Sequence, residues 1–253
     1  MGGAYGNVPA LEACIDDARA QGADRFAFLG DAIGCCGHSD ETIALIRSAF
    51  DVLVAGNHEQ QAASGAETCA CGYDSEEDER ISCMAFEYAL ESLSDGNRDW
   101  LGTWPARTRL ETSAGDLLLC HGSPERTNEF LYESQIEDDR LAAWIEEYGC
   151  RAIACTHTGL PWVHRLYDGF LALNCGVTGK PDHDGDPAVH YALLETRSDY
   201  VEASVRSVYY DHEAWADQLE REGVDEIFVE PLRTGRWTCG VESLPREEKR
   251  RAA

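Results

Sequence analysis

Apolar and polar positions alternate along the chain with two different periods. Apolar residues recur every three to four positions over residues 9–21, which predicts a helix, and the apolar run 25–29 that follows predicts a strand. The same criteria predict further helices at 40–49, 80–94, 97–104 and 136–149, and further strands at 51–54, 117–120 and 152–155. Residues 59–79 are polar and irregular, and we predict a loop there.

The last third of the chain has a different pattern. Residues 170–173, 189–194 and 200–208 are predicted to be strands in meander order, and two amphipathic helices follow them. Residues 245–253 are predicted to be a frayed tail. Strand and helix units that alternate before a run of strands predict an α/β fold, with helices flanking a mixed layered sheet. No linker interrupts the pattern, so residues 1–253 are expected to form a single domain.

The charge balance is strongly acidic. Against 47 Asp and Glu residues the chain has 21 Lys and Arg residues, of which Lys180 and Lys249 are the two lysines, and the net charge is −26. Such a surface repels nucleic acids and anionic membranes, so neither is an expected partner. No apolar run approaches the roughly 18 residues of a membrane span. No signal-peptide pattern occurs either, and we therefore expect a soluble, cytoplasmic protein.

The chain has eleven cysteines, and without a secretory signal they are expected to be reduced thiols. Three of them lie at or near the ends of apolar strands and are typical of small core residues: Cys120, Cys155 and Cys175. A second group offers a soft-metal site as an alternative, although its spacing is not that of a zinc ribbon: Cys35, Cys36, Cys69, Cys71 and Cys83. The sequence leaves the role of this second group open.

Four short polar strings follow directly after predicted strands. They carry these side chains to the strand ends: Asp31; Asn57, His58 and Glu59; His121; and His157. Because the carboxyl ends of strands in an α/β sheet converge on one crevice, the side chains can meet. Each string alone is as typical of a turn, a helix cap or a core histidine as of a metal ligand. Together they form a mixed oxygen and nitrogen set that suits a divalent transition metal such as Mn, Fe, Zn, Co or Ni.

Further motifs, together with these strings, carry a resemblance to a known family. They are GNVPALEA at 6–13, NCGVTGKP at 174–181, DGDP at 184–187 and YALL at 191–194. Over nearly its whole length the chain resembles a calcineurin-like metallophosphoesterase of the small bacterial and archaeal branch related to YfcE- and MJ0936-type phosphodiesterases. This resemblance implies a four-layer αββα sandwich, with two mixed β-sheets flanked by helices.

Members of that family normally hold two metal ions, and the resemblance implies that the ligands of the second ion are intact. The corresponding residues are Asp31, Asn57, His121 and His157. His58 corresponds to the family histidine near the leaving group, which acts as a general acid or stabilises charge. The resemblance also leads us to expect that Glu59 orients the His58 ring.

The residues that would bind the first ion and not the second are replaced. In the family they are an Asp-x-His pair before the Gly-Asn turn and the last His of a Gly-His-Thr-His string, and the corresponding residues are Gly3, Tyr5 and Gly159. Asp31 is shared by both ions and cannot hold the first one alone. Tyr5 is expected either to contact phosphate or water, or to fill the space with its ring. Substitute ligands are a further alternative, from His38, Cys35 and Cys36.

Two functions of different classes remain open. The first is a metal-dependent phosphoric ester hydrolase, a phosphatase or phosphodiesterase, with one divalent transition metal and a second ion that is weak or absent. Its expected partner is a phosphate ester or phosphorylated small molecule, and losing the two-metal clamp is expected to slow turnover by about a thousandfold or more. The alternative is a pseudo-phosphatase that binds a phosphorylated ligand or a protein partner without turnover.

Overall fold

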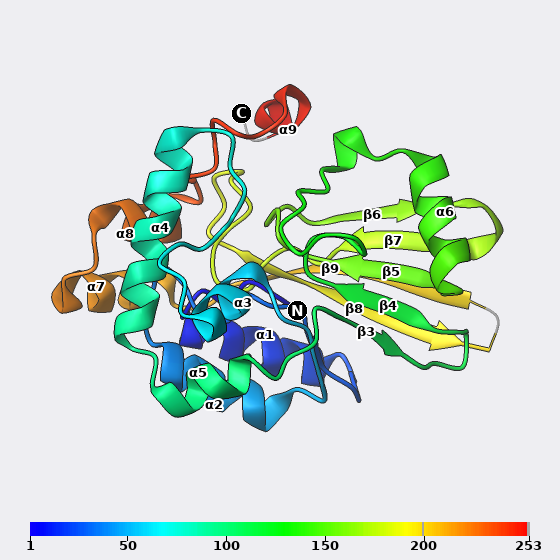
Figure 1. Cartoon of the computed structure of the whole chain (residues 1–253), viewed down its shortest axis with the longest axis horizontal. Coiled ribbons are helices and arrows are strands. Elements are labelled where there is room, and N and C mark those ends of the chain that lie inside the picture. The colour runs from blue at the N-terminus through cyan, green and yellow to red at the C-terminus, as the bar shows by residue number, and fades with distance from the viewer. Residues whose placement is uncertain (199, 252–253) are drawn as a thin grey trace.

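Two layers of β-strands pack against each other between layers of helices in the computed structural model of the chain (Figure 1). The structure describes residues 1–198 and 200–251, and for residues 250 and 251 the backbone alone. This is the four-layer αββα arrangement that the resemblance implies, and that expectation is confirmed. No helix in the described residues is both long enough and apolar enough to cross a membrane.

The larger sheet has five strands in the order β3-β4-β5-β7-β6. β4 (Leu117–Cys120), β5 (Ala152–Cys155) and β7 (Leu171–Asn174) run parallel to one another, while β3 (Arg107–Leu110) and β6 (Trp162–Arg165) are antiparallel strands at the two edges. Every residue of the three parallel strands is buried, because both faces of this sheet are covered. The segments that follow the parallel strands therefore leave the sheet at one edge.

The second strand layer contains two short parallel strands and a long hairpin. β1 (Ala27–Phe28) pairs with β2 (Val52–Leu53), and β8 (Val189–Arg197) pairs in antiparallel register with β9 (Tyr200–Val208). Since β1 and β2 are parallel, the loops after them also leave at one edge. This brings the loop that carries Asp31 beside the loop that leads into helix α3.

Helices cover the outer faces of both strand layers. α1 (Val8–Ala20) and α2 (Ser39–Ala49) share a buried apolar core with the β8–β9 hairpin. α6 (Asp138–Tyr148) packs on the other side, where Trp144 and Ile153 lie in one apolar cluster. Leu, Val and Ala side chains fill the space between the two strand layers. The layers are therefore held together by three apolar cores.

A group of helices forms a lobe beside the layers (Figure 1). α4, α7 and α8 enclose an apolar cluster of their own, which includes Trp215 and Val229. The bounds of the remaining helices are α3 (Asn57–Ser64), α4 (Glu76–Glu91), α5 (Asp95–Leu101), α7 (His212–Glu222), α8 (Glu226–Thr234) and α9 (Arg246–Arg251), with 3-10 turns at Glu133–Gln135 and Tyr167–Gly169.

Two segments predicted to be irregular are partly helical. Residues 59–79 contain most of α3 and the start of α4. Residues 246–251 form α9 rather than a frayed tail, and the buried side chain of Glu248 accepts a hydrogen bond from the Ser134 N–H. Residues 252 and 253 lie outside the described residues.

The meander order predicted for the last strands is also wrong. β7 pairs with β5 and β6 in the larger sheet, while β8 and β9 pair with each other in the second layer. The edge strands β3 and β6 were not predicted. Both are short and have polar, partly exposed residues, so they lack the apolar run that marks the central strands.

Candidate metal centre

Four segments that are far apart in the sequence bring the predicted second-site ligands together. Asp31 lies just after β1, Asn57 is the first residue of α3, His121 follows β4, and His157 lies just after β5. The ligand atoms of Asp31, His121 and His157 lie within 4.8 Å of one another. His121 Nε2 is 3.3 Å from Asp31 Oδ2 and 3.0 Å from His157 Nδ1. All four side chains are buried.

Backbone carbonyls orient the two histidines. His121 Nδ1 lies 2.6 Å from the Leu29 carbonyl oxygen, which accepts its N–H and leaves Nε2 facing Asp31 and His157. His157 Nε2 lies 3.2 Å from the Cys71 carbonyl oxygen, which leaves Nδ1 facing the centre. A metal-binding histidine commonly donates its other N–H to a carbonyl or carboxylate in this way. The two rings therefore present one nitrogen each to a common point.

Asn57 contributes an oxygen that has no partner in the protein. Its Nδ2 donates a hydrogen bond to the Cys69 carbonyl oxygen at 2.9 Å and lies 3.4 Å from Cys71 Sγ. Its Oδ1 is buried and has no hydrogen-bond partner among the described residues. Such an atom is costly, and a cation beside it would remove the cost. One carboxylate, one amide oxygen and two imidazoles fit a divalent transition metal ion.

Glu59 holds the loop that carries Asp31. Its fully buried carboxylate accepts hydrogen bonds from the N–H groups of Asp31 at 2.8 Å, Ala32 at 2.8 Å and Gly56 at 2.7 Å. Asp31 and His157 have φ values of 59° and 46°, a left-handed conformation that such residues rarely adopt without support from their surroundings. Glu59 thus positions the loop that carries the candidate ligand Asp31.

The ring of His58 is oriented by Ile33 and not by Glu59. Its Nδ1 lies 2.8 Å from the Ile33 carbonyl oxygen. Both oxygens of Glu59 are engaged with backbone N–H groups, so the expectation that Glu59 orients His58 is wrong. The other ring nitrogen, Nε2, lies 3.5 Å from Cys71 Sγ. The contact with Ile33 fixes the orientation of the ring and leaves Nε2 without a backbone partner among the described residues.

The electrostatics of the centre favour ligand-competent protonation states at Asp31 and His157. Burial lowers the pKa of His121, but the adjacent Asp31 carboxylate outweighs burial and raises that pKa above its usual value. Burial by itself raises the pKa of Asp31, but the adjacent His121 and His58 side chains hold that pKa below its usual range. Burial lowers the pKa of His157 to about 3, and the neighbouring His121 adds to this effect. His157 is therefore neutral near pH 7. An ionised carboxylate and a neutral imidazole are the forms that bind a metal ion.

The N-terminal segment lies beside the centre but carries no ligand of the first ion. Gly3 N–H donates to the Gly30 carbonyl oxygen at 2.8 Å, and Tyr5 N–H donates to the Asp31 carbonyl oxygen at 3.1 Å. Gly3 has a φ of 56°, and a Cβ at this position would lie 2.3 Å from Val177 Cγ1. An aspartate therefore cannot replace Gly3 without moving the backbone or Val177.

Gly159 is less tightly enclosed than Gly3. It has a φ of 76°, and a Cβ there would lie 3.2 Å from the Trp237 ring and 3.5 Å from Lys180 Cε. Together, Gly3, Tyr5 and Gly159 supply neither a carboxylate nor an imidazole. The residues at the expected first-ion positions therefore do not fit a metal ion.

The alternative ligands for a first ion lie in different places. His38 faces the Glu222 carboxylate at 2.7 Å and packs against Trp215, so it is not a substitute ligand. Cys36 is buried in the apolar cluster of α4, α7 and α8. Cys35 lines the cavity beside the centre. Within the described part of the chain, no group of three or more metal-binding side chains contains either thiol.

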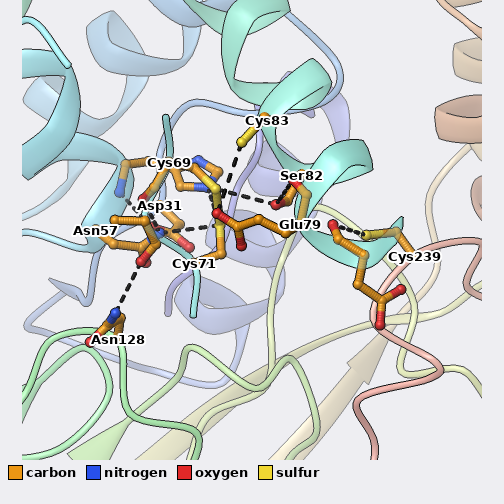
Figure 2. The surroundings of a disulfide bond; sticks show 12 residues. Asp31, Asn57, Cys69, Cys71, Glu79, Ser82, Cys83, Asn128 and Cys239 are labelled. Atoms are coloured by element: carbon orange, nitrogen blue, oxygen red, sulfur yellow. Dashed lines mark hydrogen bonds between the residues drawn. A yellow bond between two sulfur atoms is a disulfide. The ribbon is translucent and has the colours of Figure 1, made fainter. Parts of the chain in front are cut away.

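Cys69 and Cys71 form a disulfide beside the centre, with Asp31 and Asn57 on one side and Glu79 of α4 on the other (Figure 2). The expectation of reduced thiols is therefore wrong for this pair, and its sulfurs are not thiolate ligands in this oxidised form. If reduced, Cys69 and Cys71 would form a group with His58 that could hold a metal ion, and Cys69 would form another with Glu79 and Cys83. Cys83 is free and partly buried. Three further cysteines are buried free thiols, as predicted: Cys120, Cys155 and Cys175.

A cavity of about 100 Å³ lies beside the centre. Part of its lining is polar and comes from Asp31, His58, His157 and Lys180. The rest is largely apolar and comes mainly from α4, α8 and Trp237. Because one water molecule needs about 10–15 Å³ of such space, the cavity accommodates several waters or a small polar group.

Sequence reasoning assigned no role to Lys180 or Trp237. Lys180 Nζ lies 4.1 Å from the centroid of the Trp237 ring, and burial lowers the pKa of this ammonium group. The available signal for Lys180 was its rarity as one of two lysines, together with its place in the string NCGVTGKP. Trp237 follows α8, and no sequence pattern links it to the centre.

Three comparisons show which known proteins the chain is similar to. A sequence model of the calcineurin-like phosphoesterase family matches residues 3–228. The chain is 22% identical over 248 residues to the uncharacterized protein MJ0912 of Methanocaldococcus jannaschii. This alignment covers 92% of this chain and 95% of that protein.

Two solved structures share the fold. The chain is similar to a metallophosphoesterase from Sphaerobacter thermophilus, with a TM-score of 0.71 and 24% identity over 93% of this chain and 98% of that one. It is also similar to the hypothetical protein PH1004 from Pyrococcus horikoshii OT3, with a TM-score of 0.74 and 17% identity over 94% and 97% of the two chains. Since the family model spans most of the sequence, the chain belongs to the calcineurin-like phosphoesterase family.

Proposed function

We propose that the chain is a metal-dependent phosphoric ester hydrolase that works with one divalent transition metal ion: Mn, Fe, Zn, Ni or Co. Membership of a phosphoesterase family supports the reaction class. The observation that supports the ion is the buried Asn57 Oδ1, which has no partner among the described residues. The resemblance makes Asn57 a ligand together with Asp31, His121 and His157, whose ligand atoms lie close together. The absence of ligands at Gly3, Tyr5 and Gly159 supports a single ion.

The residues of the centre have distinct roles in this proposal. Asp31, Asn57, His121 and His157 would hold the ion, which when bound supplies Lewis-acid charge for a phosphoryl oxygen and acidifies water. His58 would hold a proton at Nε2 for the leaving-group oxygen, with its Nδ1 anchored on the Ile33 carbonyl.

The lining of the cavity supports a small ester rather than a polymer as the substrate. Its apolar part, from α4, α8 and Trp237, suits an ester with an apolar or aromatic leaving group. The net charge of −26 disfavours nucleic acids and anionic membranes as partners. Location in the cytoplasm remains a prediction from the sequence.

The test is hydrolysis of p-nitrophenyl phosphate and of bis(p-nitrophenyl) phosphate after loading with each of the five metals. We expect turnover with at least one metal. The His58→Ala variant should lower kcat by roughly 10²- to 10⁴-fold, the usual contribution of a general acid, while its metal content stays at the wild-type level.

His164→Ala is the matched control, because this partly exposed histidine pairs with Asp138 on the surface. It should leave both kcat and metal content unchanged. Metal-loaded protein that turns over neither ester with any of the five ions would contradict the proposal and favour the pseudo-phosphatase alternative. Wild-type activity in His58→Ala would contradict the role proposed for His58 but would leave the hydrolase proposal in place.

A further inference from the structure

Lys180 lies between two positions that the resemblance assigns to ligands of the first ion. Its Cε is 3.5 Å from the place that a Cβ would take at Gly159. Its Nζ is 5.6 Å from the centroid of the Tyr5 ring. A side-chain ammonium therefore lies between the two positions at which the resemblance implies imidazole ligands of the first ion.

The position of this ammonium group is fixed by Trp237. The ring lies 4.1 Å from Lys180 Nζ, which is close enough for a favourable cation–π interaction. The ring itself is held because its Nε1 donates to the Pro181 carbonyl oxygen at 2.6 Å, and the Trp237 backbone N–H donates to His183 Nδ1 at 2.6 Å. The loop after Lys180 thus anchors the aromatic ring against which its ammonium packs.

The charge of Lys180 is not neutralised by a partner. Among the described residues, no carboxylate forms an ion pair with it and no acceptor receives a hydrogen bond from it. The other lysine, Lys249, is exposed and donates to the Glu242 carbonyl oxygen at 2.8 Å. Since an ammonium group can donate three hydrogen bonds, Lys180 retains its full capacity to bind an anion.

Lys180 also faces the same space as the metal centre. It lines the cavity together with Asp31, His58 and His157, and among the described lining residues it is the one lysine or arginine. In a chain of net charge −26, an anionic substrate needs a local cation to offset repulsion. Phosphoryl transfer in particular requires positive charge around the non-bridging oxygens.

We propose that the Lys180 ammonium binds a phosphoryl oxygen of the substrate. The ammonium group then supplies the positive charge that the missing first ion would otherwise place at this oxygen. The ligand class is a phosphate monoester or diester, together with inorganic phosphate, the product of monoester hydrolysis. The inference rests on the proposed hydrolase function, because it assigns the substrate's phosphoryl group to the cavity beside Asp31 and His157.

The test is calorimetric titration of inorganic phosphate into protein loaded with one equivalent of Mn²⁺, for wild type, Lys180→Met and Lys249→Met. Methionine keeps the length and apolar character of the stem and removes the charge. Lys180→Met should weaken phosphate binding at least tenfold, because a charge-assisted contact is lost, and should leave Mn²⁺ affinity undiminished. Lys249→Met should match wild type within about twofold, since Lys249 is exposed and is not among the described residues that line the cavity.

Three results would overturn the proposal. One is phosphate affinity that is the same in Lys180→Met and wild type. Another is a wild-type protein that binds no phosphate. The third is a Lys180→Met variant that loses Mn²⁺ affinity together with phosphate affinity, since the effect would then pass through the metal centre.

A second measurement uses the wild-type protein alone, in case Lys180→Met does not fold. The chain has two lysines, so acetylation by acetic anhydride, followed by mass spectrometry, compares Lys180 with Lys249 in one sample. Phosphate should slow acetylation of Lys180 several-fold and leave Lys249 unaffected. Equal rates with and without phosphate, or a Lys180 that never reacts, would overturn the proposal.

These measurements separate the two proposals. Phosphate binding that depends on Lys180 without turnover of either ester would contradict the hydrolase function and leave the phosphate site in place. Turnover in a protein whose phosphate affinity does not depend on Lys180 would contradict the role of Lys180 and leave the hydrolase function in place.

Discussion

Glu59 joins the two loops that carry Asp31 and Asn57. One of its oxygens accepts from the N–H groups of Asp31 and Gly56, and the other accepts from the Ala32 N–H. The carboxylate is fully buried, so these three charge-assisted bonds are what compensates for its desolvation. The conformation of the ligand Asp31 therefore depends on a residue that does not need to touch the ion.

Replacement of Glu59 by Gln tests this role. An amide NH₂ in place of one oxygen would face backbone N–H donors, so at least one buried bond is lost. We expect the free energy of unfolding of the metal-free protein to fall by about 2–4 kcal/mol. Mn²⁺ affinity should fall as well, because the Asp31 loop is less well held.

Glu67→Gln is the control, since Glu67 is exposed in the segment after α3. It should change stability by less than about 0.5 kcal/mol. Urea unfolding of both variants gives the comparison. A Glu59→Gln protein as stable as Glu67→Gln would show that the three backbone contacts do not hold the loop.

For single residues, the sequence predicts the positions of those that come shortly after the end of a strand. Asp31, Asn57, His121 and His157 meet because parallel strands release their loops at a common edge. The positions of Lys180 and Trp237 cannot be predicted from strand ends, because they depend on how the segments after β7 and α8 fold back over the centre. The hydrogen-bond partners of Glu59 cannot be predicted in this way either, since a carboxylate beside a histidine in the sequence can accept from backbone N–H groups instead.

Among the elements, helix α1 is tied to the β8–β9 hairpin by Asp17. Its carboxylate accepts a hydrogen bond from Tyr191 Oη at 2.6 Å and further bonds from Arg206 at 3.3 Å. The Tyr191 hydrogen bond, followed by the Arg206 contacts, lowers the pKa of Asp17 below its usual value. The ionised form is therefore favoured in the folded protein.

The lowered pKa of Asp17 predicts how the free energy of unfolding depends on pH. A carboxylate whose pKa is lowered on folding contributes its full stabilisation above the unfolded value of about 3.9, and loses it as the pH falls through the folded value. Asp17→Asn should therefore lower the free energy of unfolding by about 1–2 kcal/mol at pH 7. The gap to wild type should shrink below about pH 4.

Asp16→Asn is the matched control on the same helix, because Asp16 is exposed and pairs only with the exposed Arg19 among the described residues. Urea unfolding from pH 3 to pH 7 measures both variants. A gap between Asp17→Asn and wild type that stays constant down to pH 3, or widens, would contradict the account.

There are physical reasons why hydrophobic periodicity does not predict helices α3 and α9. The first turn of α3 buries Asn57, His58 and Glu59, so its inward face is polar and gives no apolar signal. α9 is highly charged, and its buried Glu248 is stabilised by a hydrogen bond from Ser134, more than a hundred residues away. The strongly apolar strands β4 and β5 have the bounds that were predicted.

For the whole molecule, we propose that the fold of the family is kept while one of the two ion sites that the resemblance implies is closed. The N-terminal segment pairs with the loop after β1, and the backbone at Gly3 leaves no room for a side chain. Trp237, from the segment after α8, packs over Gly159 and holds Lys180 beside it. In this proposal, three distant parts of the chain replace the first site, while all four residues expected to bind the second ion are present.

The central claim is that one ion binds per chain, and anomalous scattering from crystals grown with Mn²⁺, together with elemental analysis, tests it most directly. The account predicts one anomalous peak per chain, bounded by Asp31, Asn57, His121 and His157, and a metal content near one equivalent. A second peak of comparable height beside Gly3, Tyr5 and Gly159, or no peak at the four ligands, would contradict it.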